Sequence, residues 1–404
     1  MRICYEDVLQ AKEKLGNQVI HTPMVPAVRL SARTGIKLWL KLENLQHTNA
    51  FKARGALNKL LSLTEEERKA GVIACSAGNH AQGVAFHAQR LDIPAIIVMP
   101  QGTPFNKIQK TEELGAKVVI HGNSFDESAE YTEGLVAKEG YTYIHPFDDD
   151  LVVAGQGTVG LEMLEAVPDL DVLVVPIGGG GLIGGIAVAA KGVNPNIEII
   201  GAQAELYNPV AQRRNGGELG AAGGTLAEGI AVKSPSETNI EIIDALVSDV
   251  LTATEHEIEH AVFQLLSTEK QVAEGAAGAG LAVIMNNTER FKGKKVGLVV
   301  CGGNIDSRIL STLIMRGMVQ DGRITRLRFE INDTPGQLAD ISRIIGEQGA
   351  NVIEVIHQRM MQAVPLKRAE LDVVIEARDI HHAHDIVEEL RNTGFIVHVM
   401  NELS

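Results

Sequence analysis

Short, almost continuously apolar segments alternate with longer segments of helical periodicity along most of the chain. Five of the apolar segments are predicted to be strands covered on both faces, because parallel strands buried in this way lack a polar side. They are Ala95–Pro100, Lys117–Gly122, Val172–Pro176, Glu198–Glu205 and Val296–Cys301. The alternation predicts an α/β fold with open, doubly wound sheets. Ligands of such sheets bind beyond the carboxyl ends of the strands.

The pattern of apolar positions changes near Arg323. Apolar and polar side chains alternate through Leu327, Phe329 and Ile331, which indicates a strand with one buried face. The elements predicted beyond this point follow the order βαββαβ, which is typical of a ferredoxin-like module with an antiparallel sheet. The predicted strands are Ile324–Ile331, Asn351–Met360, Lys367–Arg378 and Phe395–Met400, with one helix ending at Gly349 and another over Asp379–Asn392.

These patterns divide the chain into a domain of residues 1–318, a linker of residues 317–323 and a C-terminal domain of residues 324–404. The net charge of −14 argues against nucleic acid and anionic membranes as partners. The three widely spaced cysteines predict neither a disulfide framework nor a structural zinc site. The N-terminus lacks a signal-peptide core, and no apolar run reaches the ~20 residues of a membrane span. We therefore expect a cytoplasmic protein.

The predicted strand Val172–Pro176 leads into four consecutive glycines, Gly178–Gly181, and then into a helical pattern. Such a loop directs several backbone N–H groups toward one point, where the helix dipole adds positive charge. A phosphate group is the expected ligand, although a tight turn without a ligand would use the same residues. The segment Gly179–Gly184 also satisfies the dinucleotide fingerprint, with Glu205 at the end of the next strand, so a nicotinamide enzyme is an alternative.

Three further segments are candidates for chemistry. Lys52 precedes a predicted helix; in an apolar pocket it would be available for Schiff-base chemistry, whereas most lysines are solvated. Residues 76–83, SAGNHAQG, place small residues and amides at a strand-to-helix turn, which suits a small polar ligand or an ordinary helix cap by Asn79. The segment His256–His260 matches the zinc-protease pattern HExxH, but the apolar face of its helix leaves both histidines on the solvated side.

Four motifs occur together in this chain, and they are FKARGA (51–56), SAGNHAQG (76–83), PIGGGGL (176–182) and CGGNID (301–306). As a set they resemble the pyridoxal-phosphate-dependent serine/threonine dehydratases, whose fold is the tryptophan-synthase β-like fold, also called fold type II. The resemblance extends to about Met318 and implies a small subdomain of about residues 47–150 inserted in a large one. The region from about Ile324 resembles an ACT regulatory domain, at the turn Asp333–Gly336 and at Gly349–Val352. The set makes the nicotinamide alternative much weaker.

The resemblance assigns roles to individual residues. It implies that Lys52 holds pyridoxal phosphate as a Schiff base, that Asn79 bonds the ring hydroxyl of the cofactor, and that Cys301 faces the pyridine nitrogen. The implied cofactor-binding set is Lys52, Phe51, Asn79, Gly178, Gly179, Gly180, Gly181, Leu182 and Cys301, and the implied substrate-binding set is Ser76, Ala77, Gly78 and His80. The family often has Gly-Ser where this chain has Asn49 and Ala50, which leaves the fine geometry of substrate binding open.

The implied reaction is elimination from L-threonine, and also from L-serine, to a 2-oxo acid and ammonia, with Lys52 taking the proton from Cα. Because the thiol of Cys301 is a weak hydrogen-bonding partner, the ring nitrogen should stay largely unprotonated, which favours elimination over transamination. Racemases of this fold carry a serine where this chain has Ala77. A racemase and a catalytically silent amino-acid sensor are the two alternatives.

ACT-like modules usually associate and bind a small amino acid at their interface. The resemblance therefore implies a homo-oligomer, a tetramer or a dimer, with an amino-acid effector such as isoleucine or valine near Gly336 and Asn351. Relatives in this fold also use an acid at the position of Glu205 to hold a cation, so a metal ion at Glu205 is a further hypothesis. A solvated glutamate is the alternative there.

Overall fold

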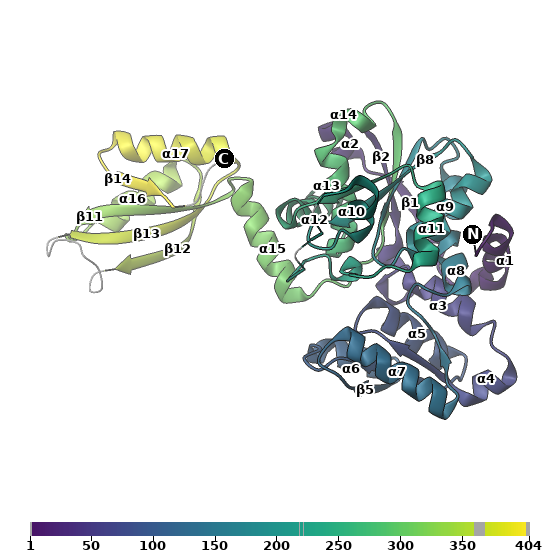
Figure 1. Ribbon diagram of the computed structural model, residues 1–404. Helices are drawn as coiled ribbons and strands as arrows, with labels where there is room; N and C mark the ends of the chain where they lie inside the picture. Colours follow the sequence, from purple (N-terminus) through teal and green to yellow (C-terminus); the bar gives the residue numbers. More distant parts are fainter. Residues whose placement is uncertain (1, 218, 221, 359–367, 401–404) are drawn as a thin grey trace. The chain divides into compact units, whose positions relative to one another are not determined.

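The computed structural model describes residues 2–217, 219–220, 222–358 and 368–400. The chain forms two compact units, Met1–Ile305 and Asp306–Ser404, and each is described by itself. Figure 1 labels most of their helices and some of their strands. Within the described ranges, no helix combines the length and the apolar character needed to cross a membrane.

The larger sheet of the first unit has the strand order β1-β2-β10-β7-β8-β9. Strand β1 runs antiparallel to β2, and the other neighbouring pairs are parallel. The apolar pattern correctly predicts β7, β8 and β10 but not β1, β2 and β9, which are short or contain charged residues. The bounds are β1 Met24–Pro26, β2 Lys37–Leu42, β7 Val172–Pro176, β8 Glu198–Ala204, β9 Asp249–Ala253 and β10 Lys295–Val300.

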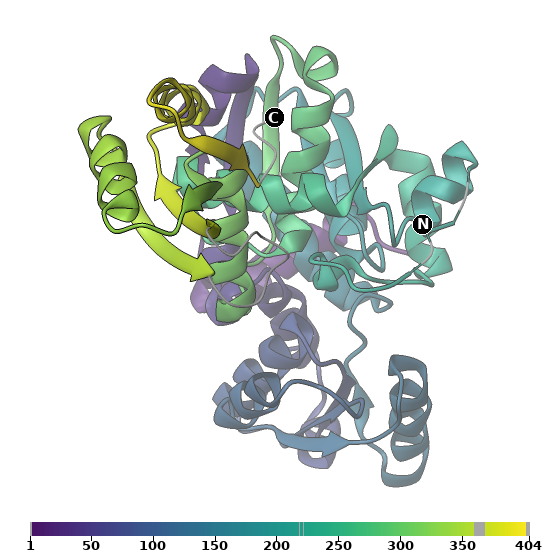
Figure 2. The same ribbon diagram turned by 90° about the vertical axis from the view of Figure 1, so that its left-hand side faces the viewer.

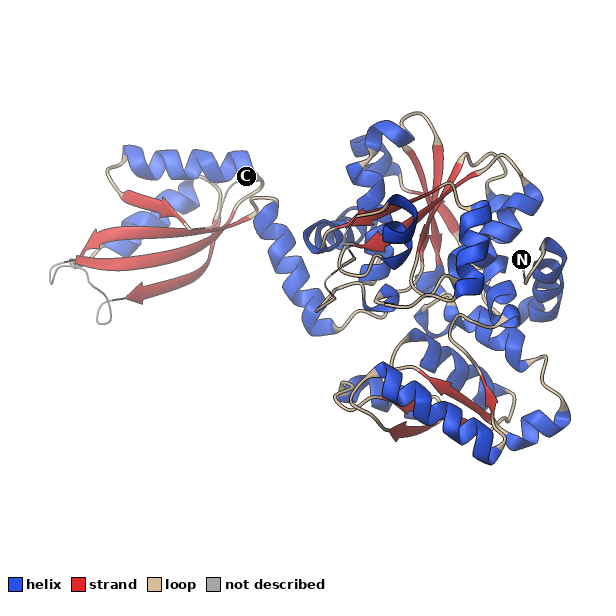
Figure 3. Ribbon diagram, in the orientation of Figure 1, coloured by secondary structure: helices blue, strands red, loops and turns tan. Residues whose placement is uncertain are grey.

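Helices cover both faces of this sheet (Figure 3). Their apolar side chains and those of the strands form one continuous core, in which every residue of β7 is buried. This double cover explains why the parallel strands have no polar face. The helices are α1 Tyr5–Leu15, α2 Val28–Thr34, α8 Asp150–Ala166, α9 Gly181–Val193, α10 Pro209–Asn215, α11 Glu237–Leu246, α12 Glu255–Glu269, α13 Gly275–Asn286 and α14 Thr288–Phe291, with short 3₁₀ turns at Gly16–Gln18, Glu43–Leu45, His47–Asn49 and Glu228–Ile230.

The smaller sheet of the first unit is entirely parallel and has the order β5-β4-β3-β6. In Figure 2 it lies below the larger sheet, with its own helices around it. It has a separate apolar core, and its strands fall within the predicted range 47–150. The bounds are β3 Val72–Cys75, β4 Ala95–Met99, β5 Lys117–Ile120 and β6 Thr142–Tyr143, with helices α3 Lys52–Leu60, α4 Glu65–Ala70, α5 Asn79–Arg90, α6 Phe105–Glu113 and α7 Phe125–Glu139.

Helix α3 packs against both α5 and α8 and so connects the two sheets. The crossing of α3 and α8 is close because both helices have a glycine there. A Cβ atom on Gly155 would lie 2.7 Å from the Cα of Gly55, and a Cβ on Gly55 would lie 2.6 Å from the carbonyl oxygen of Val152. Any side chain at either glycine would push the helices apart, and Lys52 lies at the start of α3.

The second unit contains helix α15, Ser307–Gln320, followed by a βαββαβ module with the antiparallel strand order β12-β13-β11-β14. Helices α16 and α17 both pack their apolar side chains on one face of this sheet. The module therefore has the ferredoxin-like fold of an ACT domain, as predicted. The bounds are β11 Ile324–Asn332, α16 Gln337–Glu347, β12 Asn351–Gln358, β13 Arg368–Glu376, α17 Ile380–Asn392 and β14 Ile396–Val399.

The boundary between the units differs from the predicted one. The sequence predicts a linker at residues 317–323, but α15 continues through Gln320, so the first four of these residues are helical. The second unit begins already at Asp306. Asp306 caps α15, because its carboxylate accepts hydrogen bonds from the backbone of Arg308 and Ile309. The predicted strand ends at Met360 and Lys367 lie outside the described residues.

Candidate active site

Lys52 is the first residue of α3, and its Nζ donates a hydrogen bond to the carbonyl oxygen of Pro146 at 2.6 Å. Burial lowers the pKa of Lys52 to about 8, and the nearby carboxylate of Glu274 acts in the opposite direction. The ammonium also lies 5.3 Å from the ring centroid of Phe51. A lysine with such a pKa has a large neutral fraction near pH 8, which a Schiff-base lysine needs.

The glycine loop lies between β7 and α9, and its backbone is held from two sides. The Nδ2 of Asn239 donates to the carbonyl oxygens of Gly179 at 3.0 Å and Phe147 at 2.8 Å. A Cβ on Gly179 would lie 2.2 Å from the Phe147 ring, and Gly180 has φ +91°. Neither position accepts a side chain without a shift, so the glycines are required by the geometry.

The loop is suited to a phosphate because α9 begins within it, at Gly181. The first backbone N–H groups of a helix have no acceptor within the helix, and the dipole places partial positive charge there. Leu182 follows in the first turn and is buried in the core. Bonding of the Gly179 carbonyl to Asn239 orients the loop without using its N–H groups.

Asn79 begins α5 directly beyond the carboxyl end of β3, and its amide is fixed on both sides. Its Nδ2 lies 2.9 Å from each carboxylate oxygen of Glu274, and its Oδ1 accepts from Asn304 at 2.8 Å. Cys301 follows β10 and its Sγ lies 3.9 Å from Oε1 of Glu274. Burial, with the Glu274 carboxylate beside it, raises the pKa of Cys301 well above its ordinary value, so the thiol is neutral.

The predicted substrate residues lie in the turn between β3 and α5. Ser76 accepts a hydrogen bond from the backbone of Gly78 at 3.2 Å, and Ala77 has no polar group. His80 is buried, and its Nε2 lies 2.7 Å from the carbonyl oxygen of Ile144. Burial lowers the pKa of His80 to about 3, with positive charge at Lys52 adding to the effect. The ring is therefore neutral, Nε2 carries the hydrogen, and Nδ1 is an acceptor.

Backbone contacts bring these segments into one site. The N–H of Phe51 donates to the carbonyl of Cys301 at 3.1 Å, and the N–H of Gly303 donates to the carbonyl of Asn49 at 3.0 Å. Phe147, which packs on the glycine loop, follows Pro146, the partner of Lys52. Direct contacts thus link the lysine, the glycine loop, the Asn79 turn and Cys301 beyond the carboxyl ends of β3, β7 and β10.

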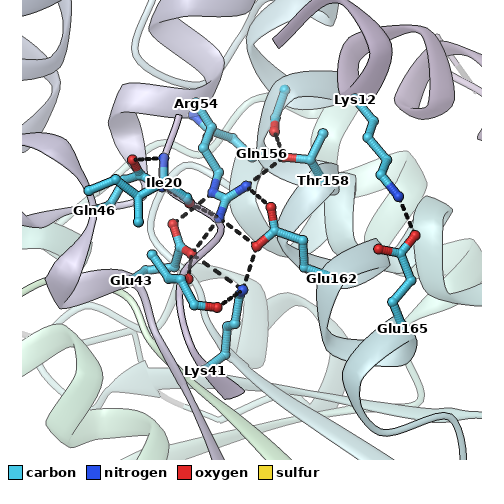
Figure 4. A network of polar contacts seen from close by, with 12 residues as sticks. Lys12, Ile20, Lys41, Glu43, Gln46, Arg54, Gln156, Thr158, Glu162 and Glu165 are labelled. Atoms are coloured by element: carbon cyan, nitrogen blue, oxygen red, sulfur yellow. Dashed lines mark hydrogen bonds and ion pairs between the residues drawn. The ribbon is translucent and has the colours of Figure 1, made fainter. Parts of the chain in front are cut away.

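A buried charge network lies around Arg54, two residues after Lys52 on α3 (Figure 4). The guanidinium of Arg54 bonds the carboxylates of both Glu43 and Glu162, at 2.6–2.8 Å. Lys41 bonds Glu162 and also the carbonyl oxygen of Thr22. We call these four residues, Lys41, Glu43, Arg54 and Glu162, the Arg54 network. It joins β2, α3 and α8 and so holds the helix that begins with Lys52.

Comparisons with known proteins show the family of the chain. A family model described as pyridoxal-phosphate dependent enzyme matches residues 16–302, so the chain belongs to this family. It is 44% identical over 400 residues to the L-threonine ammonia-lyase of Thermotoga maritima, covering 98% of this chain and 100% of the relative. It is 39% identical to the L-threonine ammonia-lyase of Geobacter sulfurreducens, covering 98% and 99%.

Solved structures share the fold of the first unit. The processed form of threonine deaminase isoform 2 from Solanum lycopersicum has a TM-score of 0.72 and 32% identity, covering 77% of this chain and 93% of that chain. Maize serine racemase has a TM-score of 0.73 and 31% identity, covering 79% and 99%. The predicted fold type II architecture is thus confirmed. The presence of a racemase among these structures means that the fold alone does not separate elimination from racemisation.

The residues of the site fit pyridoxal phosphate. Lys52 supplies an amine of lowered pKa, and the loop Gly178–Gly181 offers a helix start for a phosphate group. Asn79 and Cys301 supply an amide and a neutral thiol for the edge of a ring. Each of these groups has the chemistry that its predicted partner on the cofactor requires.

The predicted cation position and the two predicted effector positions lie outside the set of residues described above. Glu205 is exposed directly after β8, and the described residues contain no group of three or more His, Cys, Asp and Glu side chains suited to a metal. The cation at Glu205 stays a prediction. Gly336 precedes α16 with φ +99° and open space around a Cβ, so the turn requires it; Asn351 is exposed at the start of β12.

Glu274, Asn239 and Phe147 have no role predicted from the sequence, although each contacts a predicted residue. Asn239 and Phe147 carry no local signal, because they reach the glycine loop only through the tertiary structure. Glu274 has a weak one, since it is a lone carboxylate directly before the Gly- and Ala-rich helix that begins GAAGAG. Burying a carboxylate costs free energy, so an acid directly before a buried helix of small residues indicates a functional role.

Proposed function

We propose that this protein converts L-threonine into 2-oxobutanoate and ammonium with bound pyridoxal phosphate, and that it also converts L-serine into pyruvate. The observation that carries the proposal is Lys52, an amine of lowered pKa held between the glycine loop and the Asn79–Cys301 side of the site. The two full-length relatives named L-threonine ammonia-lyase support threonine as the substrate.

Different residues of this chain have different roles in the proposed reaction. When bound, pyridoxal phosphate withdraws electrons from the amino-acid substrate and makes its Cα–H acidic. Lys52 takes the Cα proton through its Nζ, which the carbonyl of Pro146 holds in place. The turn Ser76–Gly78 offers the Ser76 hydroxyl and the backbone N–H of Ala77 to the substrate carboxylate, because the N–H groups of Ser76 and Gly78 donate to Val98 and to the Ser76 hydroxyl. The β-hydroxyl then leaves as water, and hydrolysis of the unsaturated product releases ammonium and the 2-oxo acid.

Ala77 favours elimination over racemisation. A racemase needs a second acid or base on the face of the substrate opposite the lysine, and a methyl group has no proton to give. Ala77 belongs to the same turn as Ser76 and Gly78, the residues proposed to meet the substrate. The neutral thiol at Cys301 acts in the same direction, because a weak partner at the ring nitrogen does not support a long-lived carbanion.

The test is product analysis with the purified full-length chain and pyridoxal phosphate. We expect 2-oxobutanoate from L-threonine, pyruvate from L-serine and little D-serine. Borohydride treatment should attach the cofactor to the peptide that contains Lys52. Ala77→Ser should raise the yield of D-serine relative to pyruvate. Comparable amounts of D-serine and pyruvate from the unchanged chain would identify a racemase, and absence of any product would favour the silent sensor.

We also propose that the second unit regulates this activity by binding a branched-chain amino acid near Gly336 and Asn351, in a homo-oligomer. A cavity of about 310 Å³ in this unit supports a site near Gly336, whereas Asn351 pairs with Glu376 at the other end of β13 from Arg368 and does not line this cavity. Gln337, next to Gly336, lines it together with the Glu330–Arg368 ion pair, whose two charges suit an amino acid, and the apolar side chain of Ile396. Partly exposed apolar residues on the edge strand β12, Val352, Ile353 and Val355, suit contact with a second subunit.

This regulation is tested with the full-length chain and its Asn351→Ala variant, assayed across concentrations of L-isoleucine and L-valine. An effector must bind two conformations with different affinity, so the substrate curve should shift with its concentration. Asn351→Ala should need a higher concentration for the same shift. If neither amino acid moves the curve, the second unit is not a branched-chain amino-acid sensor.

A further inference from the structure

Glu274 contacts both side chains that are expected to meet the cofactor ring, although the reaction described above does not use it. It is the N-cap residue of α13, and its backbone N–H donates to the carbonyl of Gly302 at 3.0 Å. Its two carboxylate oxygens accept from the amide of Asn79, at 2.9 Å each, and one of them lies 3.9 Å from the thiol of Cys301. One carboxylate therefore joins the two ring-facing groups.

The carboxylate has little freedom to move. A Cβ on Gly302 would lie 2.5 Å from Oε1 of Glu274, and a Cβ on Gly229 would lie 3.3 Å from the same atom. The backbone of these two glycines therefore encloses the carboxylate where any other residue would displace it. The helix behind it is fixed too, since a Cβ on Gly275 would lie 2.2 Å from the carbonyl oxygen of Leu226.

The groups around Glu274 determine which atoms carry hydrogens. An ionised carboxylate only accepts, so the Asn79 amide must turn its Nδ2 to Glu274, and Asn304 meets the other end of that amide. By the same rule the S–H of Cys301 is directed to Glu274. Burial raises the pKa of Glu274 above its ordinary value, and the hydrogen bonds from Asn79 and Cys301 offset only part of this rise. The charged groups that act on it are Glu228, Lys107 and Lys52.

We propose that Glu274 is a positioning residue that orients the Asn79 amide and the Cys301 thiol toward pyridoxal phosphate, so that the thiol proton points to Glu274 and not to the ring nitrogen. This inference rests on the cofactor of the proposed function but not on its substrate. It explains how a thiol at the ring nitrogen is kept from acting as a proton donor there. The bound ring then stays the weak electron sink that elimination requires.

The variant Glu274→Gln tests the proposal because it keeps the shape and replaces one acceptor oxygen with an NH₂ donor. Only one acceptor oxygen is then left for the contacts from Asn79 and Cys301, so the orientation of these two groups is no longer fixed. The matched control is Glu228→Gln, which removes the same charge nearby from a side chain that is 62% exposed and pairs with Lys107. The bonds that Asn79 and Cys301 make to Glu274 stay in place in this control.

A second variant, Glu274→Asp, separates positioning from folding. Aspartate keeps the charge and is a preferred N-cap residue, so α13 should form as before. It is one methylene shorter, however, and its carboxylate is drawn back from Asn79 and Cys301. A purely structural cap would be satisfied by aspartate, whereas a positioning carboxylate would not.

The measurements use the full-length chain without substrate. Pyridoxal phosphate is titrated into cofactor-free protein to obtain its dissociation constant, the absorption spectrum of the bound cofactor is recorded from about pH 6 to 9, and the melting temperature of the cofactor-free protein is measured. We expect Glu274→Gln to weaken cofactor binding by about tenfold and to shift the absorption maximum, with Glu274→Asp changed in the same direction. Glu228→Gln should match the unchanged chain in both readouts.

The proposal is overturned if Glu274→Gln and Glu274→Asp both bind pyridoxal phosphate with unchanged affinity and spectrum. It is also overturned if aspartate restores both readouts fully, because a negative charge at this position would then be enough and the placement of the carboxylate against Asn79 and Cys301 would not matter. These readouts require no turnover, so a failure of threonine as substrate would leave them unaffected and would appear only in the product analysis.

Discussion

Helix α3 carries two cations two residues apart, Lys52 and Arg54, and their surroundings are opposite in kind. Arg54 is completely buried and bonds two carboxylates, which raise the pKa of its guanidinium. Lys52 bonds a neutral carbonyl oxygen, and burial lowers its pKa to about 8. The same helix thus keeps one cation permanently charged and makes the other a reactive amine.

Lys41 shows that the partner decides the outcome and not burial alone. Burial lowers its pKa as well, but the carboxylates of Glu162 and Glu43 act in the opposite direction. Within the Arg54 network two acids balance two bases, so no charge is left without compensation. The two buried lysines therefore differ in their partners, since Lys41 has two carboxylates and the carbonyl oxygen of Thr22, whereas Lys52 has the carbonyl oxygen of Pro146.

The largest expected effect is on turnover, and Lys52→Ala should produce it. Without the amine there is no attachment point for the cofactor and no base at Cα, so turnover of L-threonine should fall by at least about 10³-fold. The melting temperature of the cofactor-free protein should stay within about 3 °C, because no charged partner is left behind. Full turnover in this variant would show that the reactive cation of α3 has been misidentified.

Arg54→Met should show the reverse pattern, a large loss of stability. It leaves Glu43 and Glu162 buried with only Lys41 to compensate them, and the free energy of unfolding should fall by about 3–5 kcal/mol. Denaturant unfolding of the full-length chain measures this. The control is Arg290→Met, which breaks pairs with Glu198 and Asp249 at a site 31% exposed and should cost about 1 kcal/mol or less. If both variants lost the same free energy of unfolding, the buried Arg54 network would contribute no more to stability than the exposed pairs of Arg290.

The smallest expected effect is a difference in labelling rate between lysines. In cofactor-free protein at pH 8, about half of Lys52 is neutral, compared with about 1% or less of an ordinary lysine. Limited acetic anhydride should therefore acetylate Lys52 about tenfold faster than Lys292, which is 68% exposed, while Lys41 stays unmodified. Because the neutral form is lost as pH falls through the lowered pKa, the Lys52 rate should drop about tenfold for each pH unit below 8.

Peptide mass spectrometry measures these rates, and added pyridoxal phosphate should protect Lys52 alone. If Lys52 reacts no faster than Lys292 between pH 6 and 8, its amine is no more reactive than that of a surface lysine. The proposed difference between Lys52 and Lys41 would then be wrong.

Much of the fold and of the site could be predicted from short segments of sequence. Strands β7, β8 and β10 are covered on both faces, and their continuous apolar pattern shows it. Strand β2 could not be predicted in the same way, because Lys41 breaks its apolar pattern and is tolerated only through Glu162. The linker boundary is displaced because α15 runs on through Gly317, although a glycine often marks the end of a helix.

The sequence by itself was enough to propose which residues carry the chemistry, since Lys52, Asn79, the four glycines and Cys301 lie in short motifs near predicted strands. Only the tertiary structure decided the protonation and the hydrogen-bond partners of these side chains. The carbonyl of Pro146 lies 94 residues from Lys52 along the chain, and Glu274 lies 195 residues from Asn79. A pKa and a hydrogen-bond direction depend on burial and on such distant partners, which local sequence does not specify.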